Sequence, residues 1–203
     1  MFALVENNQF VKTVSSSKGI ELNGIQYPKT IFTLWTEAER NAIGLYEINV
    51  NSENKKDEAY YINTNITYSF NNGIVTGSYG APTAKPLNNV LFVEGDEIPS
   101  DKAVGDIKQY GLKEQKISVI KQQAAGLLAP TDWHVVKAAE VAEYSVPADI
   151  STYRAAVRTA SNDMEAKINA AADVDALKTL YEYTEQEDGT LTRPLGEFPE
   201  EIE

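Results

Sequence analysis

The apolar residues of this chain follow two different periods, and the change between them constrains the fold more than any other feature. Up to residue 79 they alternate with polar residues, as in antiparallel strands with one buried face, whereas from Leu112 they recur every three or four residues, as on one face of a helix. Between the two patterns, residues 80–86 contain two prolines and several small residues, which is typical of a linker. The sequence therefore predicts an α+β fold: an antiparallel β domain with one short helix over residues 1–86, a small helical bundle over residues 87–184 and an acidic tail over residues 185–203.

Turn signals support the β domain. Asn23 and Gly24 can take the two positive φ angles of a type I′ turn, so they predict a hairpin between the apolar residues on either side, Ile20, Leu22, Ile25 and Tyr27. Residues 60–70 alternate over eleven positions and predict one long strand, with a turn at residues 71–73 and a returning strand to Tyr79. Between the hairpins, Thr36 and Glu39 form a capping box that starts the short helix, Gly44 stops it, and residues 45–50 form another strand.

Helical spacing supports the second domain. One stripe ends before Pro130 and consists of Ile117, Ile120, Ala124 and Leu127. A short helical stretch covers residues 135–143, and a long helix opens near Asp149 or Ser151. The stripe of that helix consists of Ile150, Tyr153, Val157, Ala160, Met164 and Ile168. Residues 173–183 predict a last helix. These stripes form the core of a bundle or, alternatively, pair with helices of another chain, including a second copy.

Charge and composition exclude several classes of function. The net charge is −12, and residues 185–203 contribute seven acids and one base to it, so nucleic acid is excluded as a partner. The acidic tail serves solubility or, alternatively, docks on a basic partner. The chain has no cysteine, no apolar run long enough to span a membrane and no basic start of an export signal. We therefore expect a protein that is made and used in a cytoplasm.

No pattern of reactive side chains predicts an enzyme. His134 is the sole histidine and has no nucleophile in a recognisable context, so neither catalysis nor a zinc site is expected. An acidic loop lacks the spacing of a calcium site, and its members are Glu94, Asp96, Glu97 and Asp101. No glycine-rich phosphate loop occurs either. The sequence thus predicts a protein without cofactor or metal that acts by binding another protein.

One unusual segment, residues 127–133, lies where an apolar helix ends. It reads Leu127, Leu128, Ala129, Pro130, Thr131, Asp132 and Trp133. A spacer with Pro147 follows, and then a helix with Tyr153, Arg154 and Arg158. Over residues 113–170 this order resembles the phage tail assembly chaperone family. In the first domain, Trp35 and the acidic helix start that follows it resemble the front ends of tail-fibre assembly proteins.

The resemblance implies a bacteriophage tail-fibre assembly chaperone, which binds a fibre or other tail protein in the host cytoplasm and aids its folding or trimerisation. An alternative is a structural component of the virion, in the tail, fibre tip or baseplate. A carbohydrate-acting or host-binding protein is a third class, suggested by the aromatic residues of the β domain. Client binding by strand addition to the edge of residues 60–70 is a further hypothesis.

The candidate partner-binding residues are Trp133, Tyr153, Arg154 and Arg158. We expect Thr131 or Asp132 to cap the next helix with a side-chain oxygen, and the Trp133 indole to pack across two helices as part of the core. Arg154 and Arg158 lie four residues apart on one helical face, and arginine is enriched at binding hot spots. They are therefore better candidates than Trp133 for direct contact with a partner.

Overall fold

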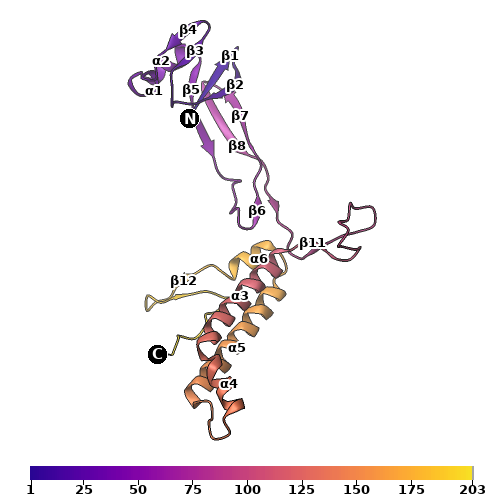
Figure 1. The fold of residues 1–203 in the computed structure, drawn as a ribbon. Helices are drawn as coiled ribbons and strands as arrows, with labels where there is room; N and C mark the ends of the chain where they lie inside the picture. Colours follow the sequence, from indigo (N-terminus) through magenta and orange to yellow (C-terminus); the bar gives the residue numbers. More distant parts are fainter. Residues whose placement is uncertain (203) are drawn as a thin grey trace. The chain divides into compact units, whose positions relative to one another are not determined.

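The computed structural model describes residues 1–202 and divides the chain into two compact units (Figure 1). The first unit runs from Met1 to Thr83 and contains a β-sheet, and the second begins at Ala84 and is mainly helical. The α+β fold predicted from the two periods is confirmed.

The first unit contains eight strands and two short helices. The strands are β1 Phe2–Glu6, β2 Gln9–Val14, β3 Ile20–Leu22, β4 Ile25–Tyr27, β5 Leu45–Asn51, β6 Tyr61–Ile62, β7 Ile66–Asn71 and β8 Ile74–Tyr79. The helices are α1 Ile31–Leu34 and α2 Glu37–Ala42. The capping box is present, because Thr36 Oγ1 accepts from Glu39 N at 3.3 Å while Glu39 Oε2 accepts from Thr36 N at 2.7 Å. The expectation of a single short helix was wrong, because α1 precedes the predicted helix α2. Helix α1 is one turn long and is stabilised by burial of Ile31 and Phe32.

Five strands form one sheet in the order β2-β1-β5-β8-β7. Pairing is antiparallel except between β5 and β8, where Ile48 lies opposite Val75 in a parallel register. The prediction of a purely antiparallel sheet was therefore wrong. Alternation could not reveal this, because side chains point to opposite faces with a period of two in both kinds of pairing. The parallel pair arises because the chain travels through β6 and β7 before β8 returns beside β5.

Both faces of this sheet are packed. One face carries a buried cluster with α1 and the β3–β4 hairpin, made of Phe2, Leu4, Val14, Leu22, Ile31, Phe32 and Leu45. The other face buries Ala3, Val5, Ile48 and Val75. The outer strands β2 and β7 approach each other there, since the rings of Phe10 and Tyr68 stack with centroids 4.7 Å apart. The sheet is therefore rolled rather than flat.

The hairpins form as predicted, but the long strand over residues 60–70 does not. Asn23, Gly24, Asn72 and Gly73 all have positive φ angles, and β3 pairs with β4 and β7 with β8. Residues 63–65, however, interrupt the strand between β6 and β7. Asn63 bonds to the backbone of Lys56 through both amide atoms, and Thr64 Oγ1 accepts from Gly80 N at 2.7 Å. These side-chain bonds compete with the ladder and end it.

The second unit begins within the predicted linker. Its strands are β10 Val90–Leu91, β11 Ile107–Gln109, β12 Thr184–Glu185 and β13 Leu191–Thr192, and the division between the units falls within β9 Thr83–Ala84. Its helices are α3 Leu112–Leu128, the 3₁₀ turn η1 Ala129–Thr131, α4 Asp132–Glu140, α5 Ala148–Ala170 and α6 Val174–Thr179. Residues 86–89 bond to the start of α3: Leu112 N donates to Pro86 O at 2.9 Å and Gly111 N to Asn89 Oδ1 at 2.8 Å. The boundary thus lies three residues before the one predicted at residue 86.

A hairpin of two antiparallel helices, α3 and α5, is the centre of this unit (Figure 1). The buried residues of α3 include Ile117, Ile120 and Ala124, and those of α5 include Tyr153, Val157, Met164 and Ile168, as the two stripes predicted. The acidic tail returns to α5, because Leu195 is 1% exposed and Lys167 Nζ donates to the carbonyls of Pro194 and Leu195. Residue 203, the last of the predicted tail, lies outside the described residues. Over residues 1–202, no helix is both long and apolar enough to cross a membrane.

Candidate partner-binding site at the tip of the helical hairpin

The unusual sequence segment forms the corner where α3 gives way to α4. The last carbonyls of an α-helix have no partner within the helix and must be satisfied from elsewhere. Arg154 of α5 supplies one donor, because its Nη1 donates to Leu128 O at 2.9 Å and to Thr131 Oγ1 at 2.6 Å. Its Nη2 also forms an ion pair with Asp132 Oδ1 at 2.8 Å. The guanidinium therefore joins the end of α3, the 3₁₀ turn and the start of α4.

Thr131 and Asp132 contribute to this corner differently from what the sequence predicted. Neither side chain caps α4, which begins without a side-chain cap bond. Thr131 Oγ1 instead donates backward to Leu128 O at 2.9 Å, and Asp132 holds Arg154. The chain passes from α3 through the 3₁₀ turn into α4 while staying helical, so the start of α4 presents few unsatisfied N–H groups for a cap to bind.

Trp133 does not belong to the core. Its side chain is 53% exposed, so the expectation that its indole packs across two helices was wrong. The inner face of α4 is formed instead by His134 and Ala138, which are half-buried and four residues apart. Trp133 lies on the opposite side of the helix from Ala138, and no residue of α4 is fully buried.

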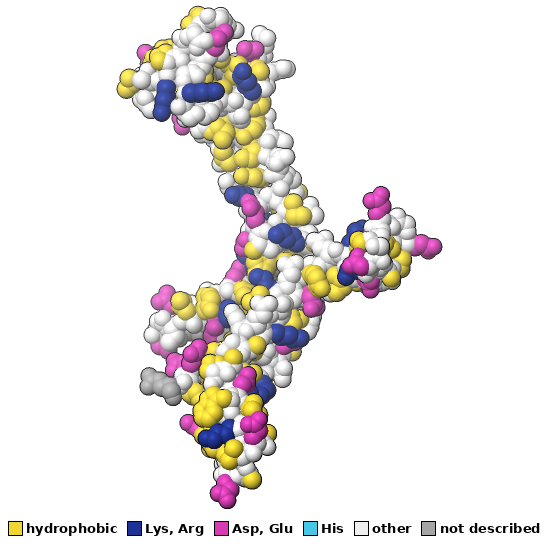
Figure 2. Space-filling view, in the orientation of Figure 1, with side chains coloured by type: hydrophobic (Ala, Val, Ile, Leu, Met, Phe, Trp, Pro, Cys, Tyr) yellow, Lys and Arg dark blue, Asp and Glu magenta, His cyan; other side chains and the backbone are white. Residues whose placement is uncertain are grey.

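Exposed apolar side chains gather around Trp133. We call this set the tip patch, and it consists of Trp133, Val136 and Val141, each at least 45% exposed. Val135 is equally exposed, but it lies on the other side of α4 from Trp133. In the space-filling view, apolar surface is visible together with acidic side chains around the α4 end of the second unit (Figure 2). An exposed apolar patch with a polar rim is typical of an interaction surface.

Aromatic rings and one lysine order the side chains of the tip. The His134 ring lies against the Trp133 indole with centroids 3.6 Å apart, and its Nδ1 is hydrogen-bonded to the Tyr144 hydroxyl. Lys137 Nζ lies 5.7 Å from the centroid of the Trp133 ring and 4.3 Å from that of Tyr144. Trp133 thus has a defined orientation although half of it faces solvent, which reduces the entropy it loses on binding a partner.

Of the four predicted binding residues, two are exposed and two are buried. Trp133 and Arg158 lie on the surface, and Arg158 Nη1 donates to Arg154 O at 3.4 Å. Tyr153 and Arg154 are each 6% exposed, so they support the corner rather than offer a free surface. The Tyr153 hydroxyl lies 3.5 Å from Leu127 O, and burial, with a smaller effect of Glu201, raises its pKa.

Sequence reasoning missed Val136, Val141, Lys137 and Tyr144 at this site. A signal was present, because Trp133, Val136 and Lys137 are spaced three and four residues apart and share one face of a helix. Seen alone, that spacing also fits a buried face with a solvent-exposed lysine. The exposure of the face depends on how α4 leaves the hairpin, which the spacing does not determine.

The edge of the sheet is a weaker candidate. Strand β7 is an outer strand, as the hypothesis of strand addition requires. Its middle is approached by β2, however, through the stacked rings of Phe10 and Tyr68. The break at residues 63–65 also leaves only the six residues of β7 for pairing.

Among residues 1–202 there is no group of three or more side chains that could hold a metal ion. Comparisons with protein-family models, with curated proteins and with solved structures give no match. The geometry of the tip, together with the motif that forms it, is therefore the basis for a functional proposal.

Proposed function

We propose that this protein is an assembly chaperone for a bacteriophage tail fibre and that it holds its client through the tip patch. The observation that carries the proposal is the half-exposed Trp133, presented on a corner that the buried Arg154 stabilises. Tryptophan is enriched at the hot spots of protein–protein interfaces. The resemblance of residues 113–170 to the phage tail assembly chaperone family supports a tail-fibre protein as the client.

A tail-fibre chain needs such a protein because it is prone to aggregate before it trimerises. Tail fibres are long, β-rich trimers, and their unpaired edges and apolar faces are open to aggregation before the three chains meet. A binding surface on a helical hairpin covers such a face reversibly, since a small patch gives a modest affinity. The client is then released when trimerisation buries the same face.

Co-expression of the fibre protein of the same phage tests the proposal. We expect the fibre to be insoluble alone and to become soluble and trimeric with the wild-type chain, as measured by sedimentation and native gel electrophoresis. Trp133→Ala should abolish the rescue. The matched control is Tyr110→Ala, which removes another exposed aromatic side chain of the second unit and should leave the rescue intact.

Two results would contradict the proposal: a fibre that is equally soluble without the chain, or full rescue by Trp133→Ala. We expect Trp133→Ala to lower the free energy of unfolding by about 1–2 kcal/mol, through loss of the ring pair with His134 and of the contact with Lys137. The variant stays folded, since a domain of this size has a larger stability, so loss of rescue is not a folding defect. Mass spectrometry of purified virions then distinguishes a chaperone that is released from a component that stays in the tail.

A further inference from the structure

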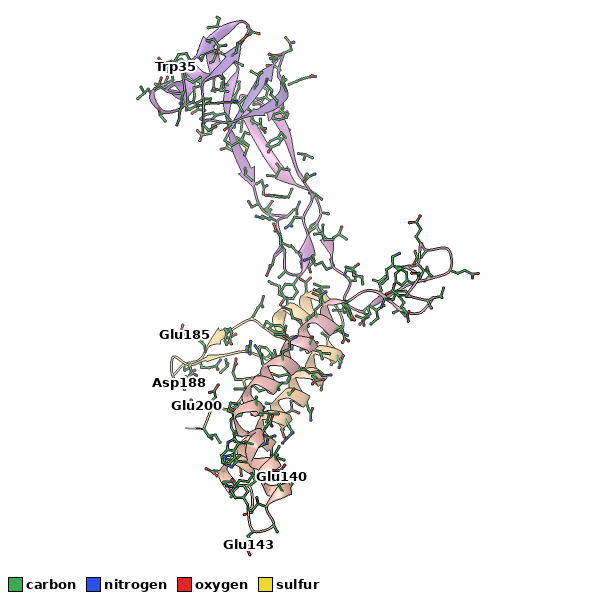
Figure 3. All side chains as sticks on the ribbon, in the orientation of Figure 1. Trp35, Glu140, Glu143, Glu185, Asp188 and Glu200 are labelled. Atoms are coloured by element: carbon green, nitrogen blue, oxygen red, sulfur yellow. The ribbon has the colours of Figure 1, made fainter. Side chains whose placement is uncertain are left out.

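The tip patch is surrounded by acidic side chains. Glu140 lies on the same helical face as Trp133 and Val136, Glu143 follows in the loop, and Asp149 lies in the first turn of α5. Figure 3 shows Glu140 and Glu143 at the α4 end of the second unit. All three are exposed, and among the described residues no ion pair neutralises any of them.

Acids outnumber bases around the patch. Arg154 is buried and its charge is paired with Asp132. Lys137 keeps its charge over the rings of Trp133 and Tyr144, where it offsets one of the three unpaired acids. The field around the patch is therefore negative, and a chain with a net charge of −12 adds to it at longer range. A partner with an apolar anchor between basic residues would fit both the patch and its rim.

Two other occupants do not fit this charge. A second copy would bring two negative rims together, and like charges opposite each other oppose association. An anionic lipid surface is repelled in the same way, although tryptophan and valine side chains suit a membrane interface. An apolar patch alone could bind any of these three partners, and the acidic side chains around it favour a basic protein segment.

We propose that the tip patch docks a segment of the client in which apolar residues are flanked by lysine or arginine. This rests on the proposed function and adds the chemistry of the partner: the apolar residues cover Trp133 and Val136, and the basic flanks face Glu140 and Glu143. The attraction between the rims accelerates encounter and weakens as salt screens it.

Labelled synthetic peptides and fluorescence anisotropy with the full chain test this chemistry. One peptide has leucines at helical spacing between lysine flanks, a second has the same leucines between glutamate flanks, and a third has lysine flanks with the leucines replaced by glutamine. We expect binding of the first peptide alone. Trp133→Ala should weaken it at least about tenfold. The double variant Glu140→Gln and Glu143→Gln should weaken it about threefold to tenfold at low salt, since exposed charge pairs each contribute modestly.

A matched pair of charges serves as the control. Glu185 and Glu187 lie in the β12–β13 hairpin and are exposed, so their replacement by glutamine removes the same net charge away from α4 (Figure 3). Binding should stay within about twofold of wild type in that variant. Equal losses in the two double variants would overturn the proposal, as would tight binding of the glutamate-flanked peptide.

The other occupants give distinct results. Dimerisation in analytical ultracentrifugation that Trp133→Ala abolishes, or co-sedimentation with phosphatidylglycerol vesicles that it abolishes, would overturn the basic-segment proposal in favour of a second copy or a lipid surface. If the fibre is rescued by wild type and by the Glu140 and Glu143 variant at equal efficiency but not by Trp133→Ala, the charge chemistry is wrong while the chaperone function stands.

Discussion

The buried charge of Arg154 is stabilised by a backbone carbonyl and a hydroxyl more than by its ion pair. The side chain of its partner Asp132 is 60% exposed, and a pair open to solvent contributes little to stability. The hydroxyl of Thr131 accepts in a buried position and the carbonyl of Leu128 in a partly buried one. The stability of the corner therefore depends on the guanidinium meeting these two oxygens.

We expect Arg154→Met to lower the free energy of unfolding of the second unit by about 2–4 kcal/mol, because the acceptors lose a charged donor and stay buried. Arg154→Lys restores the charge without the planar fork and should recover only part of the loss. Asp132→Asn should cost less than about 1 kcal/mol. Urea denaturation followed by circular dichroism measures all three, and an Asp132→Asn loss as large as that of Arg154→Met would show that the ion pair dominates.

The sequence identified the residues of this corner but assigned some of their roles the wrong way round. The spacing placed Leu127 and Tyr153 correctly on two helices, whereas α4 begins at Asp132, three residues before the predicted helical stretch over residues 135–143. Burial then reversed the expectation, since Trp133 is exposed and Arg154 is buried. Residue type predicts the average burial of tryptophan and arginine, whereas a helix end with unsatisfied carbonyls requires a buried donor at one particular position.

At the scale of the element, the capping box makes the stability of α2 depend on pH. The bonds from the Thr36 backbone N–H and hydroxyl to Glu39 lower the pKa of that carboxyl in the folded protein. A carboxyl whose pKa is lowered by folding stabilises the fold above its unfolded-state pKa, and the contribution is lost as pH falls through the folded-state pKa. The box therefore holds at neutral pH and opens in acid.

We expect Thr36→Ala to raise the pKa of Glu39 towards its ordinary value, because the variant loses the hydroxyl donor and loosens the box. Carbon-detected NMR titration of the Glu39 carboxyl measures this, and Glu37, in the same first turn but without such bonds, is the internal control. An unchanged Glu39 pKa in the variant would mean that the hydroxyl has no part in lowering it.

Local signals in the sequence predicted the elements that depend on neighbouring residues, and failed where distant residues decide. Turns at Asn23–Gly24 and Asn72–Gly73 need only the φ angles of their own residues, and both were predicted. The interruption at residues 63–65 depends on a bond from Gly80, sixteen residues later. The parallel partner of β5 likewise arrives only after two further strands, and no periodicity records it.

At the scale of the whole molecule, the linker shows where one unit ends and the other begins. Residues 86–89 satisfy N–H groups at the start of α3, so the helical unit includes Pro86, the last residue of the predicted linker. Gly111 permits this contact, because a Cβ there would lie 2.3 Å from the backbone carbonyl carbon of Asn88.

We therefore expect Gly111→Ala to destabilise the second unit by about 1–3 kcal/mol, since the clash is with backbone that must move. The first unit has its own cores on both faces of the sheet and should be unaffected. Hydrogen exchange followed by NMR tests this: amides of α3 should lose protection while those of β1 and β5 keep theirs. Gly126→Ala, where a Cβ meets nothing within 4 Å, is the matched control, and equal loss of protection in both units of Gly111→Ala would show that they unfold together.

The way the acidic segment returns to α5 has a practical consequence for finding a binding partner. Leu195 and Lys167 hold the segment after β13, whereas the turn of the β12–β13 hairpin is exposed and Gly189 has a φ of +81°. An affinity tag inserted between Asp188 and Gly189 would leave the contact of Leu195 with α5 intact. It would also leave the tip patch on α4 unchanged. Such an internally tagged chain is the best bait for isolating, from cells that express it, whatever protein binds the tip patch.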